Sequence, residues 1–213
     1  MLRSLDSMLG SSIVAIDGEI GKVFNVLFDD RSWAVRYLVV ETGSWLTRRK
    51  VLLSPAVLAR PNWTERTIAV RLTREQVQSS PDIDADQPVS RQQELAMIRH
   101  YRWPGYMDAE PGFPQTEAGE SGDPHLRSAR EVANYQVDAE DGPLGTIADF
   151  IIDDDGWEIL DLVVDAQSSL NEHKVLVPTR WLSGVSWDDR RVRSRHPRLH
   201  SIAADELIEA WRA

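Results

Sequence analysis

The sequence predicts a mainly β protein that is built from two small closed sheets in tandem. Three observations carry this prediction. The chain repeats itself at a constant offset of 124 residues. Each copy contains an Asp-Gly pair between apolar segments, which is typical of a tight hairpin turn. Each copy also holds five short segments in which apolar and polar residues tend to alternate, as in half-buried strands.

The repeat covers residues 2–66 and 126–190, and roughly a third of the aligned positions are identical, against about one in sixteen for unrelated sequences of ordinary composition. The identities include LRS, the DGxxG turn, an Asp-Asp pair, LVV and KVL. A duplication of this extent favours two small domains over one large domain.

The strands follow from the alternation between turns. Those expected in the first copy are 11–17, 22–30, 33–41, 50–55 and 66–72, and their counterparts are 136–141, 146–154, 157–165, 174–179 and 190–194. Short strands joined by tight turns leave exposed edges in a flat sheet, and closure into a small barrel removes these edges.

Helices are expected after the first barrel and at the C-terminus. Thr73 and Gln76 have the spacing of a capping box, and Pro81 ends the short helix that they begin. Two further amphipathic helices are expected within 90–101 and 201–211. The segment 108–124 is rich in Pro, Gly and acidic residues, which predicts a flexible linker. The predicted organisation is a first barrel at 1–80, a helical extension at 81–107, the acidic linker at 108–124, and a second barrel with a C-terminal helix at 125–213.

Composition excludes several classes of protein. The chain has no cysteine, which excludes disulfides, thiolate zinc sites and cysteine nucleophiles. Its net charge is −10, so general nucleic-acid binding is not expected. No apolar stretch is long enough for a membrane helix, and Asp6 interrupts any would-be signal peptide. We therefore expect a cytoplasmic location.

No catalytic constellation is recognisable. The five histidines are scattered, and no Gly-x-Ser-x-Gly elbow occurs. The sequence therefore predicts no catalytic residue, no cofactor and no metal site. One alternative stays open at Asp153-Asp154-Asp155, since carboxylates are ligands for Ca²⁺ or Mg²⁺. The preferred interpretation is a turn at a strand end in which Asp side chains cap backbone amides.

The repeated segments resemble the PRC-barrel family, which includes the cytoplasmic domain of the photosynthetic reaction-centre H subunit and a small-subunit ribosome maturation factor. The resemblance rests on DGEIGKVFNVLFDD, WAVRYLVVET and KVLLSP in the first copy, and on DGPLGTIADFIIDDDGW, ILDLVVD and KVLVPTRWL in the second. It implies two PRC-type barrels that dock on a protein partner and catalyse nothing. A membrane complex bound at its cytoplasmic face and a homodimer are both left open as partners.

The candidate partner-binding residues are Trp45, Arg48, Arg49 and Trp211. An aromatic residue beside arginines is the usual composition of an interface anchor. Burial of Trp45 against its own barrel is the competing interpretation. Two other functions remain as alternatives: a ribosome- or RNA-associated factor that uses the arginines between Arg190 and Arg198, and a metal-dependent enzyme that uses the Asp153 region.

Overall fold

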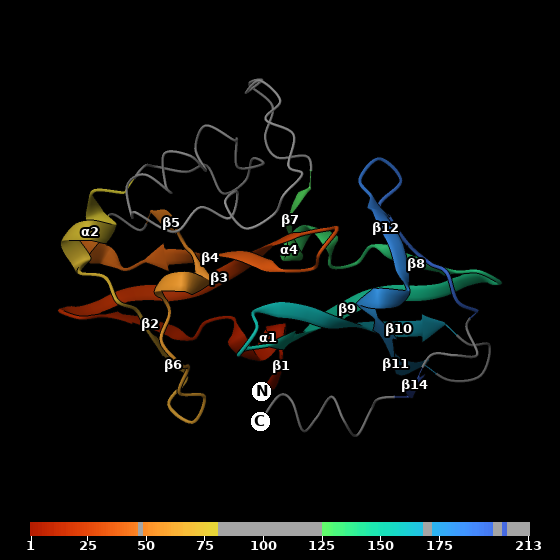
Figure 1. Cartoon of the computed structure of the whole chain (residues 1–213), viewed down its shortest axis with the longest axis horizontal. Coiled ribbons are helices and arrows are strands. Elements are labelled where there is room, and N and C mark those ends of the chain that lie inside the picture. The colour runs from red at the N-terminus through yellow and green to blue at the C-terminus, as the bar shows by residue number, and fades with distance from the viewer. Residues whose placement is uncertain (47–48, 81–124, 168–171, 198–201, 204–213) are drawn as a thin grey trace. The chain divides into compact units, whose positions relative to one another are not determined.

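The chain is mainly β in the computed structural model, which describes residues 1–46, 49–80, 125–167, 172–197 and 202–203 (Figure 1). Its strands are β1 (Leu2–Ser4), β2 (Ser12–Ala15), β3 (Gly18–Asp29), β4 (Val35–Thr42), β5 (Lys50–Leu53), β6 (Thr67–Ala69), β7 (Leu126–Ser128), β8 (Gln136–Ala139), β9 (Gly142–Asp153), β10 (Glu158–Gln167), β11 (Glu172–Pro178), β12 (Leu182–Ser186), β13 (Arg191–Ser194) and β14 (Ile202–Ala203). Its helices are α1 (Leu5–Met8), α2 (Arg74–Gln78) and α4 (Ala129–Val132), with 3₁₀ turns η1 (Ser44–Leu46), η2 (Pro55–Val57) and η4 (Thr179–Trp181). None of the helices within these ranges is long and apolar enough to cross a membrane.

The strands form two mixed sheets. One has the order β12-β13-β8-β9-β10-β11-β14, with β1 pairing β9, and the other has the order β5-β4-β3-β2-β6, with β7 pairing β3. Both sheets are mixed, since β13 pairs parallel with β8 in one and β2 pairs parallel with β6 in the other. Neither sheet closes through the strands of the described ranges, so the closed form of the two predicted barrels is not confirmed. In the β5–β6 sheet, the segment after η2 meets the region of β6 through isolated bridges, Leu58 with Val70 and Asn62 with Thr67.

The chain divides into two contact units that do not follow the repeats. Unit 1 contains residues 1–10, 25–35 and 127–213, and unit 2 contains residues 11–24 and 36–126. Unit 1 therefore includes short pieces of the first repeat together with most of the second. The domain boundaries expected from the sequence stay a prediction.

Unit 1 contains reciprocal contacts between equivalent parts of the two repeats. β1 pairs antiparallel with β9 (Figure 1). Leu2 on β1 packs against the core cluster of Ile151, Val163 and Leu176. The turns at Trp33 and Trp157 exchange backbone hydrogen bonds, since Val35 N donates to Trp157 O (2.7 Å) and Ile159 N donates to Trp33 O (2.9 Å). LRS, which the sequence shows only as a repeated tripeptide, is thus a strand that pairs with the other copy.

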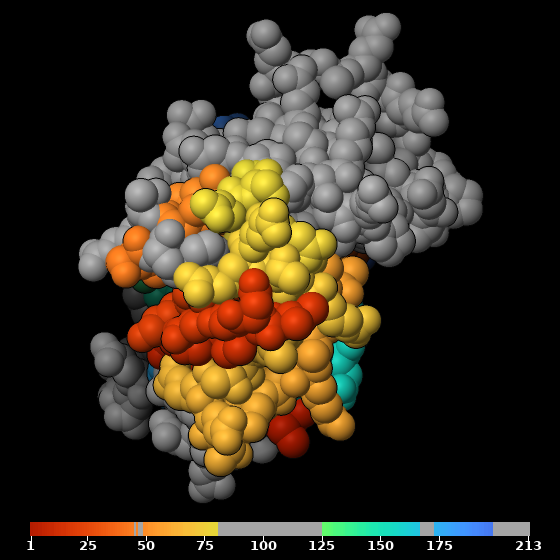
Figure 2. Space-filling view, turned by 90° about the vertical axis from the view of Figure 1, so that its left-hand side faces the viewer, coloured from red at the N-terminus to blue at the C-terminus, as the bar shows by residue number. Residues whose placement is uncertain are grey.

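Unit 2 is organised around the β2–β3 hairpin, which Figure 2 shows at the surface with the α2 region on one side and the segment around β6 on the other. The predicted Asp-Gly turn is confirmed: Gly18 has φ +142°, and its repeat counterpart Gly142 has φ +129°. The capping box is also confirmed, because Thr73 and Gln76 bond reciprocally at the start of α2. Asp17 Oδ1 accepts from Arg74 N (2.8 Å) and joins the hairpin tip to that helix.

One helix prediction is wrong at its start. Ile202 and Ala203 form β14 and pair with Leu176 and Val175 of β11. The edge of β11 offers unpaired backbone groups, and their satisfaction outweighs the helical pattern of the local sequence. The rest of that expected helix and the one within 90–101 lie outside the described residues.

Candidate functional site

Arg49, which the sequence places in a partner-binding loop, has its guanidinium engaged within unit 2. Its Nη2 donates to Val77 O (3.1 Å), Ser80 O (2.8 Å) and Ser80 Oγ (2.8 Å). A cation suits the end of α2 because the last carbonyls of a helix carry partial negative charge. Arg49 therefore ties its loop to α2. Trp45 begins this loop within η1, but its side chain lies outside the described positions, as do Arg48 and Trp211.

A different tryptophan and arginine come together in unit 1. The guanidinium carbon of Arg127 lies 5.1 Å from the ring centroid of Trp187. Arg127 Nε also donates to Asp30 Oδ2 at 2.6 Å, and both of these charged side chains are largely buried, at 14% and 7% exposed. The carboxylate fixes the arginine, and the arginine in turn supports the face of the indole.

Trp187 lies in the ordered turn between β12 and β13. Arg190 N donates to Trp187 O (3.2 Å), while Ser186 Oγ donates to Asp189 Oδ2 (3.1 Å) and accepts from Asp189 N (3.4 Å). Trp187 is 38% exposed, which makes it one of the three large apolar residues in the described ranges that are exposed rather than buried or half-buried. An aromatic side chain held rigid while exposed loses little conformational entropy when a partner covers it.

Polar side chains from α4 and the residues that follow it lie next to the turn that carries Trp187. Arg190 lies over the ring of Tyr135, 5.4 Å from its centroid. Burial raises the pKa of both Glu131 and Tyr135, and the hydrogen bond between them together with Arg127 and Arg190 offsets part of the effect on Glu131. We define the Trp187 site as Asp30, Arg127, Glu131, Tyr135, Trp187 and Arg190.

The arginine-rich strand that motivates the RNA alternative is partly neutralised by its own neighbours. Arg191 Nη1 lies 2.7 Å from Asp138 Oδ2, and Arg193 Nη2 lies 3.4 Å from Asp189 Oδ2. Phosphate recognition depends on cations free to replace counterions. These ion pairs reduce the positive field that β13 presents.

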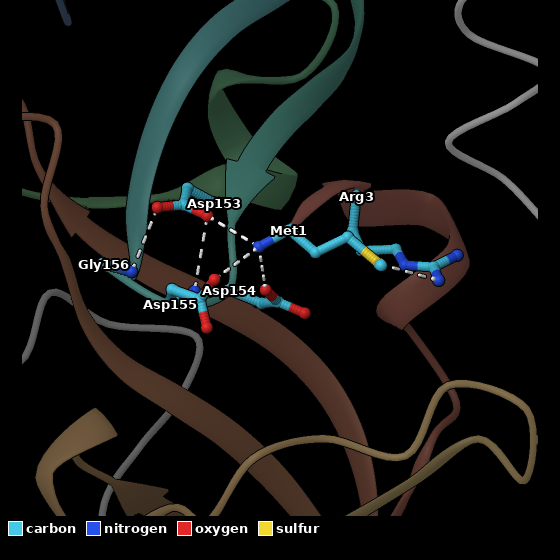
Figure 3. Close-up of polar contacts among 6 residues, drawn as sticks. All are labelled: Met1, Arg3, Asp153, Asp154, Asp155 and Gly156. Carbon is cyan, nitrogen blue, oxygen red and sulfur yellow. Dashed lines mark hydrogen bonds and ion pairs between the residues drawn. The ribbon is translucent and has the colours of Figure 1, made fainter.

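The acidic turn after β9 holds the amino group of Met1 (Figure 3). The ammonium lies 2.9 Å from Asp153 Oδ1, 2.5 Å from Asp154 Oδ1 and 3.0 Å from Asp155 Oδ2. These contacts raise the pKa of the Met1 amine to about 11, chiefly through its bonds to Asp154 and Asp153, and they lower the pKa of Asp153.

The capping interpretation of the paired aspartates is confirmed. Asp153 Oδ2 accepts from Gly156 N (3.1 Å), and the equivalent Asp29 Oδ1 accepts from Arg31 N and Ser32 N (both 3.0 Å). One oxygen of each of the three carboxylates lies within 4.8 Å of the others, which is close enough for a cation. The cation that they hold here is the ammonium of Met1, and metal binding at this turn stays a prediction.

No family model matches this chain, and no curated protein matches it significantly. The resemblance to PRC barrels therefore stays a prediction from the sequence.

Sequence reasoning missed the Trp187 site because its members come from three separate segments. One signal was present: Trp187 and Arg190 are repeated from Trp63 and Arg66, which marks the turn as a retained feature. Arg127 and Asp30 are also repeated positions, but nothing local shows that they meet across the two copies.

The amine contacts predict a stabilisation that disappears at high pH. A group whose pKa is raised on folding stabilises the fold below its unfolded pKa, here 8.0, and this contribution is lost as the pH rises through about 11. We expect the free energy of unfolding to fall over this window, by an amount that salt reduces because the amine lies near solvent. Denaturant unfolding between pH 7.5 and 11 measures it. The same series on D153N/D154N removes the two carboxylates that raise the pKa of the amine most, and comparison with it cancels the titration of lysines and tyrosines. Identical pH slopes in the two proteins would contradict the prediction.

Proposed function

We propose that this protein is a non-enzymatic adaptor that binds a protein partner. It is built from two PRC-type β units whose sheets are not closed into complete barrels by strand pairing. The observation that carries the proposal is the Trp187 site, where a part-exposed indole is held by a buried arginine–aspartate pair. Tryptophan and arginine dominate the residues that contribute most to protein–protein binding. The site has the composition of such an anchor.

The duplicated architecture supports the same function. Two β units in one chain present two related but diverged surfaces, and the sequence differences between them allow different contacts. The proposal includes a cytoplasmic location and a partner such as a membrane complex reached from its cytoplasmic face, as the resemblance to the H subunit implies.

Replacing Trp187 tests the proposal. A tagged full-length chain is purified from its native cells, and the recovered proteins are quantified by mass spectrometry against W187A. We expect W187A to reduce recovery of the main partner about tenfold or more, which corresponds to the loss of an interface anchor. Far-UV circular dichroism and thermal unfolding confirm that the variant is folded.

The repeat supplies a matched control. Trp63 occupies the equivalent position in unit 2, so W63A makes the same truncation at a side chain outside the Trp187 site. If wild type, W187A and W63A recover equal amounts of the partner, the proposal that the partner binds at the Trp187 site would be contradicted. W45A, R48A and W211A form a second arm that tests the loop and terminus expected from the sequence. Loss of the partner on ribonuclease treatment would favour the RNA-associated alternative.

A further inference from the structure

Two segments of unit 1 are fastened by the same polar arrangement. The N-terminal clasp, which we define as Met1–Gly10, is bonded to Asp149 on β9 through Ser4 Oγ (2.5 Å) and Asp6 N (3.1 Å). The second clasp, residues 127–134, is bonded to Asn25 on β3: Asn25 Nδ2 donates to Ser128 Oγ (2.8 Å), and Arg130 N donates to Asn25 Oδ1 (3.2 Å). Each of these positions is offset from its counterpart by 124 residues.

The match extends to the strand that carries each side chain. Phe150 N donates to Asp149 Oδ1, and Val26 N donates to Asn25 Oδ1, both at 2.8 Å. Asp149 and Asn25 are both 4% exposed. One oxygen of each side chain thus accepts two backbone N–H groups, and the two arrangements differ only in the group that meets the serine hydroxyl.

Whether the side chain donates to the serine hydroxyl or accepts from it depends, for Asp149, on whether its carboxyl group carries a proton. The amide of Asn25 donates to Ser128, whereas an ionised Asp149 can only accept from Ser4. A protonated Asp149 has the same donor and acceptor pattern as Asn25 and could make the same contact with Ser4. The second copy therefore shows that an uncharged side chain, the amide of Asn25, can make the contacts that hold such a clasp.

The surroundings of Asp149 disfavour its charge. Burial raises the pKa of Asp149, and the carboxylate of Asp6 on α1 raises it further, while the bonds from Ser4, Phe150 N and Asp6 N lower it in part. Val163 lies opposite on β10 and is uncharged, and the nearby Asp161 pairs opposite Ile151. Arg3 precedes Ser4 on β1, where successive side chains point to opposite faces.

We propose that the N-terminal clasp is controlled by a proton on Asp149, with neutral Asp149 holding it closed and ionised Asp149 loosening it. The second clasp lacks this control because an amide, Asn25, stands in place of the carboxyl group. Loosening of the N-terminal clasp frees β1 from its three-residue pairing with β9. The exposed edge at Ile151–Asp153 is then available for pairing with another strand. This device is independent of the Trp187 site.

The direction of the pH dependence follows from linkage. A carboxyl group whose pKa is raised on folding stabilises the closed state in full below its unfolded value of 3.8, and this stabilisation is lost as the pH rises through the raised pKa. The protection of the N-terminal clasp against amide hydrogen exchange is therefore expected to decline as the pH rises from acid toward neutral. The decline is about tenfold for each unit by which the pKa is raised.

Hydrogen exchange of the full-length chain between pH 4 and pH 8 tests the proposal, with D149N as the reference. The ratio of wild-type to D149N protection in residues 2–9 cancels intrinsic exchange and the titration of the Asp153–Asp155 turn. We expect this ratio to fall as the pH rises, and we expect D149N to remain protected throughout. A ratio that is constant with pH would overturn the proposal, as would a D149N clasp that is open at every pH.

N25D provides a gain-of-response variant that does not depend on D149N folding well. It creates the same buried carboxyl in the second clasp. The ratio of N25D to wild-type protection in residues 127–134, which cancels the titration of Glu131, should therefore fall as the pH rises. A ratio of N25D to wild-type hydrogen-exchange protection in residues 127–134 that stays constant with pH would count against the mechanism.

Discussion

Replacing Gly145 with alanine is expected to destabilise unit 1 severely. A Cβ at this position would lie 2.0 Å from Asp165 O and 2.8 Å from Asp165 C, so β9 and β10 would have to separate. These are backbone atoms of the paired strand β10, so no flexible side chain can move aside to make room. We expect a loss of about 3 kcal/mol or more in the free energy of unfolding, measured by urea denaturation.

Gly156 offers the matched control within the same unit. Its added Cβ would meet only Asp153 Oδ2, at 3.2 Å, and a side chain in a turn can adjust. G156A is expected to change stability by less than about 1 kcal/mol. Equal midpoints for G145A and G156A would contradict the close-approach argument. The equivalent G21A, whose Cβ would lie 2.0 Å from Glu41 O, should destabilise unit 2 for the same reason.

Removing the charge of Arg127 is expected to give the second large effect. Asp30 is 7% exposed, and R127M would leave its carboxylate without the cation that lies 2.6 Å away. Breaking a buried ion pair from one side typically costs about 3–5 kcal/mol, because the remaining charge stays desolvated. We expect a loss of about 3 kcal/mol at neutral pH by denaturant unfolding.

Two further variants separate this effect from general damage. The double variant R127M/D30N removes both charges and should recover part of the lost stability. R191M breaks a pair that is 46% and 22% exposed, so it is expected to lower stability far less than R127M does. R127M and R191M with the same stability would show that burial of the first pair has no energetic consequence.

The sequence anticipated the local chemistry well. The Asp-Gly turns, the capping box at Thr73 and the aspartate caps at Asp29 and Asp153 are each complete within a few residues, so their spacing alone predicts them. The C-terminal segment was misassigned at Ile202, because the choice between helix and strand there was made by the distant edge of β11.

The candidate site was anticipated less well for the same reason. The adjacent aromatic and basic residues at Trp45 predict an interface loop, and the structure adds that Arg49 of this loop bonds to the end of α2. The Trp187 site joins residues 30, 127 and 187, which no local pattern connects. Only the fold shows that an arginine from one repeat meets an aspartate from the other.

The sequence by itself determined that the chain is a duplicated, mainly β protein, because alternation, turn glycines and repeat identities depend on neighbouring residues. Only the tertiary structure decided that β1 pairs with β9 in the other repeat, that Asp149 fastens this clasp, and why the second glycine of each DGxxG turn must lack a side chain. Those features depend on distances between residues far apart in the chain, and such distances are set when the strands pack.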